Sequence, residues 1–196
     1  MSDTSRRVIL VRHGRTALNA EGRLRGLADP QLDETGIAEA HATATALIPL
    51  GLTRIVSSPL RRAVTTATII AEASRITAEV DPAFNDRDYG PWTGEVKTDV
   101  IRQWGSVDDA PGVENRRDVL ARARRALDAL ADRSHGPGPA AVVTHDAVIR
   151  PVLEHIEPGI VLEVETASWA ELRRTRDGWE IVSVDNTAPD SSSRAS

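Results

Sequence analysis

Residues 6–26 read RRVILVRHGRTALNAEGRLRG, and this stretch decides the fold class of the chain. Residues 8–11 form an apolar run that is typical of a strand buried on both faces. The run ends at Arg12, His13 and Gly14, so the strand delivers a cation and an imidazole to its carboxyl end. In open α/β sheets the ligand crevice lies at that end of the strands. The stretch therefore predicts an α/β protein with a polar site beside its first strand.

Short strands and longer helical stretches alternate along the rest of the chain. The helical stretches are residues 33–50, 58–73, 114–133 and 147–155, and the strand-like runs between them are 54–57 and 140–144. Residues 167–175 and 178–185 flank a turn and predict a terminal hairpin. Strands separated by helices imply a mainly parallel central sheet covered on both faces. We therefore expect a three-layer α/β/α sandwich.

Two segments fall outside this alternation. Residues 85–112 have no clear period and are interpreted as a small insertion over the candidate active site. Residues 187–196 are small and polar and predict a flexible C-terminal tail. A chain of 196 residues suits one ordinary domain, which we place at residues 1–186.

The composition excludes several classes of function. No apolar run approaches the roughly 18 residues of a membrane span, so we expect no membrane partner. The net charge of −5 argues against a nucleic-acid partner. The chain has no cysteine, which excludes disulfides and thiolate chemistry. The first seven residues lack the apolar segment of a secretory signal, and we expect a cytoplasmic protein.

Polar side chains follow three of the predicted strands. His13 and His145 each come directly after a strand, and Ser57 and Ser58 follow a third. The carboxyl ends of parallel strands meet at one edge of a sheet, so we expect these residues to share a pocket. No role is assigned to the other histidines, which are His41, His135 and His155.

Five motifs resemble those of the histidine phosphatase superfamily, also called the phosphoglycerate mutase-like family. The segment RHGRTALN at 12–19 is similar to its signature R-H-G-[E/Q]-[T/S]-x-x-N. The other four are LRGLADPQLDETG at 24–36, SSPLRRAVTTA at 57–67, NDRDYGPWTGE at 85–95 and VVTHDAVIR at 142–150. Their agreement in order implies the family's α/β/α sandwich and a reaction through a phosphohistidine.

The resemblance implies that His13 is the nucleophile and that Arg12, Arg62 and His145 bind the phosphoryl group. These residue types suit displacement at phosphorus, because a phosphate ester needs fixed cations around its oxygens and a nucleophile held in line. Arginine forks match phosphate geometry. We expect a backbone carbonyl to accept from the second ring nitrogen of His13 and to fix its tautomer. The neighbouring Arg61 points about 100° away on a helix and is expected at the surface.

Further substrate contacts are predicted for Gly14, Arg15, Thr16, Asn19 and Arg25. Gly14 lets the backbone turn tightly beside the imidazole and approach the ligand. Thr16 and Asn19 match signature positions, and the family's asparagine contacts the phosphate. Arg15 and Arg25 stand where the family usually has glutamate and glutamine. The lost negative charge at Arg15 favours a more anionic substrate.

Two carboxylates compete for the role of general acid. Asp86 matches the position of the family's usual glutamate and is one methylene shorter. Asp146 follows His145, where the phytase-like branch of the superfamily carries an aspartate donor. Asp146 also suits the N-cap of the following helix. We assign the acid to Asp86 and keep Asp146 as the alternative.

The sequence thus predicts a phosphomonoester hydrolase that acts on a small phosphorylated metabolite without metal or cofactor. One alternative is a cofactor-dependent phosphoglycerate mutase. Mutases that hold a bisphosphorylated intermediate carry a long insertion between the acid and the second histidine, and the segment from 86 to 145 is short by comparison. Another is a protein that binds phosphorylated ligands without turnover. A metal-dependent His-Asp phosphohydrolase is disfavoured, because no further His/Asp cluster supplies ligands. Tyr89, Trp92 and Trp104 are candidates for an apolar wall around the leaving group.

Overall fold

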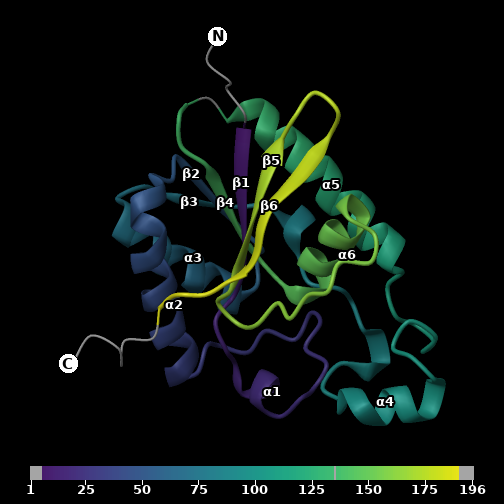
Figure 1. Ribbon diagram of the computed structural model, residues 1–196. Helices are drawn as coiled ribbons and strands as arrows, with labels where there is room; N and C mark the ends of the chain where they lie inside the picture. Colours follow the sequence, from purple (N-terminus) through teal and green to yellow (C-terminus); the bar gives the residue numbers. More distant parts are fainter. Residues whose placement is uncertain (1–5, 135, 190–196) are drawn as a thin grey trace.

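The computed structural model describes residues 6–134 and 136–189. Within these residues six strands form one sheet in the order β3-β2-β4-β1-β5-β6 (Figure 1). They are β1 (Arg6–Arg12), β2 (Arg54–Ser57), β3 (Ala78–Val80), β4 (Ala140–Thr144), β5 (Trp169–Arg174) and β6 (Trp179–Asn186). The first four strands run parallel, whereas β5 is antiparallel to β1 and β6 to β5. The predicted mainly parallel sheet and terminal hairpin are confirmed.

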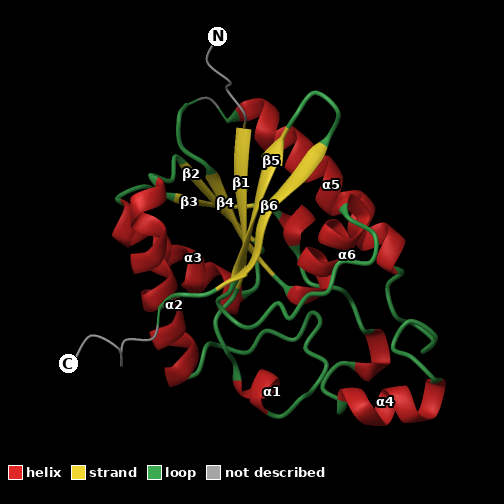
Figure 2. Cartoon of the chain, in the orientation of Figure 1, coloured by secondary structure: helices red, strands yellow, loops and turns green. Residues whose placement is uncertain are grey.

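Helices cover both faces of this sheet, as Figure 2 shows. One face carries α2 (Glu34–Leu47), which continues into η1 (Ile48–Leu50), and α3 (Arg61–Ser74). The other face carries α5 (Arg116–Arg133) and α6 (Asp146–Ile156). These helices lie where the sequence showed helical periods, so the three-layer α/β/α sandwich is confirmed.

The central position of β1 explains its uninterrupted apolar sequence. Val8 and Leu10 are buried in the core cluster that includes α5 and α6. Ile9 and Val11 are buried in the cluster on the side of α2 and α3. Because successive side chains of a strand point to opposite faces, both faces of β1 must be apolar. Each such burial stabilises the fold by about 1.5–3 kcal/mol, which makes β1 a firm support for the residues that follow it.

The insertion at residues 85–112 packs against the loop that follows β1. It contains η3 (Gly90–Trp92) and α4 (Lys97–Trp104). Leu24 of that loop forms a separate buried cluster with Val100 and Ala110. The backbone N–H of Leu24 also donates to Glu95 O at 2.9 Å. Helix α4 was not predicted, because its eight residues span only about two turns within a segment that was interpreted as an insertion without a clear period. The remaining short helices are α1 (Ala17–Ala20) and η2 (Pro82–Phe84).

None of the helices in residues 6–134 and 136–189 is long and apolar enough to cross a membrane. The single domain predicted over residues 1–186 stays a prediction. The predicted tail begins at 187, and its residues from 190 onward lie outside the described part of the chain. His135 also lies outside it.

Candidate active site

The register of the parallel strands brings three strand ends together. Arg12 is the partner of Thr144 across β1 and β4, and Ser57 is the partner of Val143 across β2 and β4. The His13 backbone N–H continues this pairing by donating to Thr144 O at 3.0 Å. As a result, the rings of His13 and His145 lie with their centroids 5.1 Å apart. The predicted convergence of these strand ends is therefore observed.

His13 is fully buried and is held in a single tautomer. Its Nδ1 lies 2.7 Å from Gly14 O, and a carbonyl can only accept, so Nδ1 carries the proton. Nε2 then bears the lone pair, and it is buried without a hydrogen-bond partner in the described chain. Burial lowers the pKa of His13 well below its ordinary value, and His145 and Arg62 lower it further. The imidazole is therefore neutral at neutral pH, which is the nucleophilic form.

Gly14 is required by close backbone packing. A Cβ at Gly14 would lie 2.3 Å from Gly36 O at the start of α2. The Gly14 N–H donates to Thr66 Oγ1 of α3 at 3.1 Å, and that hydroxyl donates to Arg62 O. This close approach to a neighbouring backbone requires glycine in its own right, and the contact of Gly14 with the ligand stays a prediction. Together these contacts fix the loop that carries His13.

Two arginines are anchored beside the imidazoles, and each has a buried Nε without a partner in the described chain. Arg62 is fully buried on α3 and donates to Gly26 O, to Ala28 O and, at 2.8 Å, to Asp86 Oδ2. Arg12 donates from Nη1 to Val164 O at 2.6 Å. Burial lowers the pKa of Arg12 to about 10 and also lowers the pKa of Arg62. Both guanidinium groups are therefore charged and desolvated at neutral pH.

Arg61 differs from its neighbour as expected. Its side chain is 64% exposed and pairs with Asp29 at 3.4 Å. Position on the helix alone therefore distinguishes these two adjacent arginines.

His145 is positioned by Ser58, which the sequence predicted to lie in the same pocket but to which no role was assigned. Its Nε2 lies 2.8 Å from Ser58 Oγ, and its Nδ1 lies 3.5 Å from Asp86 Oδ2. The nearby carboxylate favours the proton on Nδ1, with the serine hydroxyl donating to Nε2. Burial, followed by Arg62 and Arg25, lowers the pKa of His145 well below its ordinary value. A neutral His145 thus presents one N–H toward the site.

The buried polar atoms without partners gather in this cluster. In the described part of the chain, five of the seven such side-chain atoms are Arg12 Nε, His13 Nε2, Arg25 Nε, Arg62 Nε and His145 Nδ1. Four of the five are donors, and the fifth is the lone pair of His13. Buried polar groups are normally satisfied, so an unsatisfied set of this kind marks a ligand site. Donors of this type, most of them cationic, suit an anion.

The two candidate acids differ in their contacts. Asp86 is buried, and its Oδ1 accepts from the Arg87 N–H while its Oδ2 accepts from Arg62. Arg122 fixes the surrounding loop by donating to Asn85 O and Asp86 O. Both acceptors of Asp86 are therefore engaged, one of them by a guanidinium of the cluster.

Asp146 is half-buried and pairs with Arg150, with Nη2 and Oδ1 3.1 Å apart. The residue at the N-cap of α6 is His145, so the expectation that Asp146 fills the cap position is wrong. Asp146 lies instead in the first turn, where a carboxylate is stabilised by the helix dipole.

The remaining predicted contact residues make bonds within the protein. Arg15 donates to Asp33 Oδ2 at 3.0 Å and to Thr35 Oγ1 at 2.8 Å, so its guanidinium is held at the start of α2. Thr16 caps α1 and shares a capping box with Asn19. Asn19 Oδ1 accepts from Thr16, and its amide nitrogen has no partner within the described residues.

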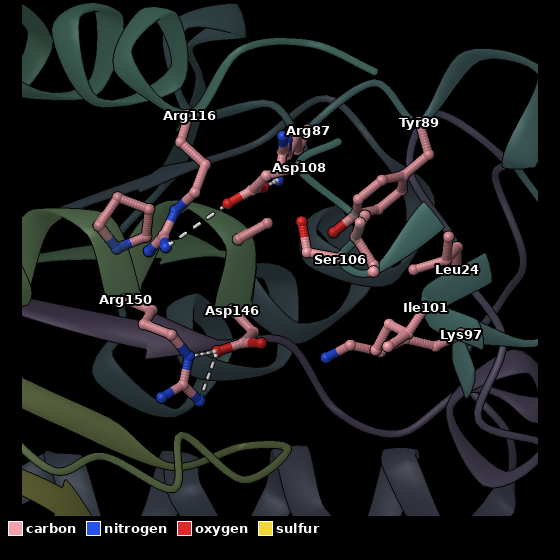
Figure 3. Close-up of a pocket in the computed structure, with 14 residues that line it drawn as sticks. Leu24, Arg87, Tyr89, Lys97, Ile101, Ser106, Asp108, Arg116, Asp146 and Arg150 are labelled. Carbon is pink, nitrogen blue, oxygen red and sulfur yellow. Dashed lines mark hydrogen bonds and ion pairs between the residues drawn. The ribbon is translucent and has the colours of Figure 1, made fainter. Parts of the chain in front are cut away.

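A cavity of about 260 Å³ opens beside Asp146 (Figure 3). In Figure 3 the carboxylate of Asp146 and the ammonium of Lys97 both point into it. Tyr89 lines the same cavity, and burial raises the pKa of its hydroxyl, which stays protonated. Trp92 and Trp104 do not extend this wall as expected, because Trp92 packs in the cluster around Leu24 and edge-on against Trp104 at 5.7 Å.

No group of three or more His, Cys, Asp or Glu residues in the described chain is placed to hold a metal ion.

Comparison with known proteins gives one family. The model of the histidine phosphatase superfamily (branch 1) matches residues 8–187. A bifunctional protein of Mycobacterium tuberculosis is 34% identical over an alignment of 160 positions, which covers 76% of this chain and 44% of that protein. The chain thus spans less than half the length of that relative. The probable phosphoglycerate mutase GpmB of Yersinia pestis is 30% identical over an alignment of 201 positions, which covers 92% of this chain and 93% of the relative.

Solved structures agree with this result. A mycobacterial glucosyl-3-phosphoglycerate phosphatase superposes with a TM-score of 0.81 at 26% identity, covering 93% of this chain and all of that chain (100%). A second structure, described as mycobacterial hydrolase 1, gives a TM-score of 0.83 at 27% identity over 94% of this chain and 100% of the other.

Proposed function

Because the chain belongs to branch 1 of the histidine phosphatase superfamily, we propose that it is a phosphomonoester hydrolase that works through a phosphohistidine intermediate. One observation carries the proposal. The free Nε2 of His13 is buried among four unpartnered donors of Arg12, Arg25, Arg62 and His145 in the described chain. A phosphoryl group would satisfy these donors while its phosphorus faces the lone pair.

In the first step, Nε2 of His13 attacks phosphorus and the bond to the leaving oxygen breaks. Arg12, Arg62 and His145 donate to the non-bridging oxygens and stabilise the charge of the transition state. The Gly14 carbonyl keeps the proton on Nδ1, so the ring attacks in its neutral form and becomes cationic only as the bond forms. In the second step, water attacks the phosphohistidine and releases phosphate.

Asp86 is proposed as the acid that protonates the leaving oxygen and as the base that then activates water. Its burial beside the imidazoles, with Oδ2 3.5 Å from His145 Nδ1, supports this assignment. Asp146, which points into the neighbouring cavity, is the alternative donor. These steps use only side chains, so the proposed enzyme is independent of metals and cofactors.

A small phosphorylated metabolite is the proposed substrate, and a cytoplasmic location stays a prediction of the sequence. The similar solved structure of a glucosyl-3-phosphoglycerate phosphatase supports hydrolysis, whereas the relative named a probable phosphoglycerate mutase supports the mutase alternative. We favour hydrolysis, because a mutase must hold a bisphosphorylated intermediate by both ends and the segment between Asp86 and His145 is short.

The test measures both the intermediate and the product. The wild-type protein should hydrolyse p-nitrophenyl phosphate in the presence of a chelator and form an acid-labile, base-stable phosphoenzyme. His13→Ala should abolish both. With 3-phosphoglycerate and a catalytic amount of the bisphosphate, inorganic phosphate should appear without 2-phosphoglycerate. Turnover by His13→Ala would refute the mechanism, and accumulation of 2-phosphoglycerate would establish the mutase instead.

A further inference from the structure

Arg25 contributes a positive charge that forms no ion pair within the described residues. Its Nε is buried and finds no acceptor there. Arg62, in contrast, is held by Asp86 and two backbone carbonyls, and Arg12 is held by Val164 O. The Arg25 side chain as a whole is only partly buried, so solvent or a ligand can reach its guanidinium and accept from it.

The backbone on either side of Arg25 places it beside the reaction centre. Arg25 also lowers the pKa of His13 and His145 through its charge. Its neighbour Leu24 lines the cavity, while Gly26 O accepts from Arg62 Nη2 at 2.9 Å. The short turn that carries Arg25 therefore lies between Arg62 and the cavity beside Asp146.

The cationic groups at the site and the availability of a proton donor together determine which leaving groups the site can release. An alkoxide leaves as a strong base and needs a proton in the transition state. Both oxygens of Asp86 already accept hydrogen bonds, one of them from Arg62. A phosphate leaving group departs as an anion, needs no proton, and is stabilised by a cation beside the bridging oxygen. The additional guanidinium of Arg25, together with an Asp86 carboxylate whose oxygens both already accept hydrogen bonds, suits a leaving group that departs as an anion.

We propose that Arg25 adapts this site to leaving groups that depart as anions, so that the protein cleaves terminal phosphoanhydrides of diphosphates in addition to phosphomonoesters. The inference rests on the proposed phosphatase function. Nε2 of His13 attacks the terminal phosphorus, and the bond from that phosphorus to the bridging oxygen breaks. The electron pair stays on the bridging oxygen, which leaves as part of a phosphate anion paired with Arg25. Water then attacks the phosphohistidine, the P–N bond breaks with its electron pair on Nε2, and the proton of water passes to the Asp86 carboxylate and from there to solvent.

The experiment compares two small substrates that differ in the leaving group. Inorganic pyrophosphate releases phosphate, and glycerol 3-phosphate releases an alkoxide that requires protonation. Arg25→Gln removes the charge but keeps a hydrogen-bond donor. We expect it to lower kcat/KM for pyrophosphate by about tenfold or more relative to glycerol 3-phosphate. The matched control Arg61→Gln removes a charge from an exposed position and should change this ratio by less than about twofold.

Arg25→Lys serves as the second variant, because it keeps the charge and should retain most of the preference for pyrophosphate. Equal losses for both substrates in Arg25→Gln would overturn the inference and leave Arg25 as an ordinary phosphoryl ligand. A ratio in Arg25→Lys as low as in Arg25→Gln would also overturn it. So would a wild-type protein that hydrolyses p-nitrophenyl phosphate but not pyrophosphate. Failure to hydrolyse p-nitrophenyl phosphate would instead refute the proposed phosphatase function itself.

Discussion

Arg62 Nη2 lies 2.8 Å from Asp86 Oδ2, and both side chains are buried. The pair joins Arg62 of α3, which is proposed to bind the phosphoryl group, to the loop that carries the candidate acid. Removing one member would leave the other as a buried charge without its partner, which is strongly destabilising. Binding of the phosphoryl group and placement of the acid are therefore coupled through a single contact.

This contact predicts a large difference between two adjacent arginines. Arg62→Ala should lower kcat/KM for p-nitrophenyl phosphate by a transition-state cost of about 3 kcal/mol or more, because a charged donor leaves a preorganised site. Arg61→Ala should cost little, since its side chain is 64% exposed. Steady-state kinetics with circular dichroism as a folding check make the comparison. The reverse ranking would contradict the assignment of Arg62 to the site.

A second prediction concerns the support of Arg12. Val164 has a φ of 49°, which is strained for a β-branched residue, and its carbonyl accepts from Arg12. Asp185 holds this turn by accepting from the backbone N–H groups of Glu163 and Val164. Asp185→Ala should therefore weaken inhibition by inorganic phosphate by roughly tenfold, since bonds to a charged group contribute about 1.5–3 kcal/mol.

Asp177→Ala, an exposed aspartate in the turn between β5 and β6, is the control and should leave phosphate inhibition unchanged. If Asp185→Ala lowered only thermal stability and not phosphate affinity, the carboxylate would support the fold without positioning Arg12.

The elements that dominate the fold could be predicted because each carries its own pattern. The apolar run of β1 is buried on both faces, and the long amphipathic helices show a 3.6-residue period. Short elements offer too few residues for such a pattern to identify them. Strand β3 has three residues, all of them exposed, and it exists because it pairs with β2. Helix α4 is held by contacts to the loop after β1 that no local window of sequence contains.

In the candidate site, too, the sequence predicts some residues and misses the contacts that support them. Arg12, His13, Arg62 and His145 come together because strand ends and one helix start place them, and those positions are visible in the sequence. The supports of the site are distant in the chain. Arg12 bonds to Val164 O, which lies 152 residues away, and His145 bonds to Ser58, which lies 87 residues away. Ser58 stood in a recognised motif, but its partner becomes evident only when the strands are aligned.

Acid pH should destabilise the ligand-free protein. The pKa values of His13 and His145 are lowered well below the ordinary value of 6.5 in the folded chain. Below about pH 6.5 the unfolded chain therefore binds protons that the folded chain does not, and the free energy of unfolding decreases as the pH falls. The slope should reach at most about 1.4 kcal/mol per pH unit for each histidine.

Urea denaturation at a series of pH values between 7.5 and 5.5 measures this effect. His13→Asn should remove about half of the pH dependence, because one of the two buried imidazoles is gone. An exposed histidine provides the control, and His155→Asn should leave the slope unchanged. An identical slope in His13→Asn and the wild type would show that His13 titrates normally in the folded chain.

The last prediction identifies the general acid. An alkyl leaving group needs a proton in the transition state, whereas p-nitrophenolate leaves readily without one, and acid assistance contributes about 10² to 10⁴ in rate. Asp86→Asn should therefore slow hydrolysis of glycerol phosphate much more than hydrolysis of p-nitrophenyl phosphate. Asp146→Asn should lower both modestly and equally. Asparagine keeps the shape of each side chain and can still accept from Arg62 or Arg150, so the comparison isolates the proton.

The two variants also separate the remaining mechanisms. Dephosphorylation of phospho-His13 should slow in Asp86→Asn, because the same carboxylate then activates water. Dependence on the leaving group in Asp146→Asn would assign the acid to Asp146, as in the phytase-like branch of the superfamily. If neither variant shows it, no side-chain acid acts in the first step, and leaving groups that depart as anions would be the ones this site hydrolyses efficiently.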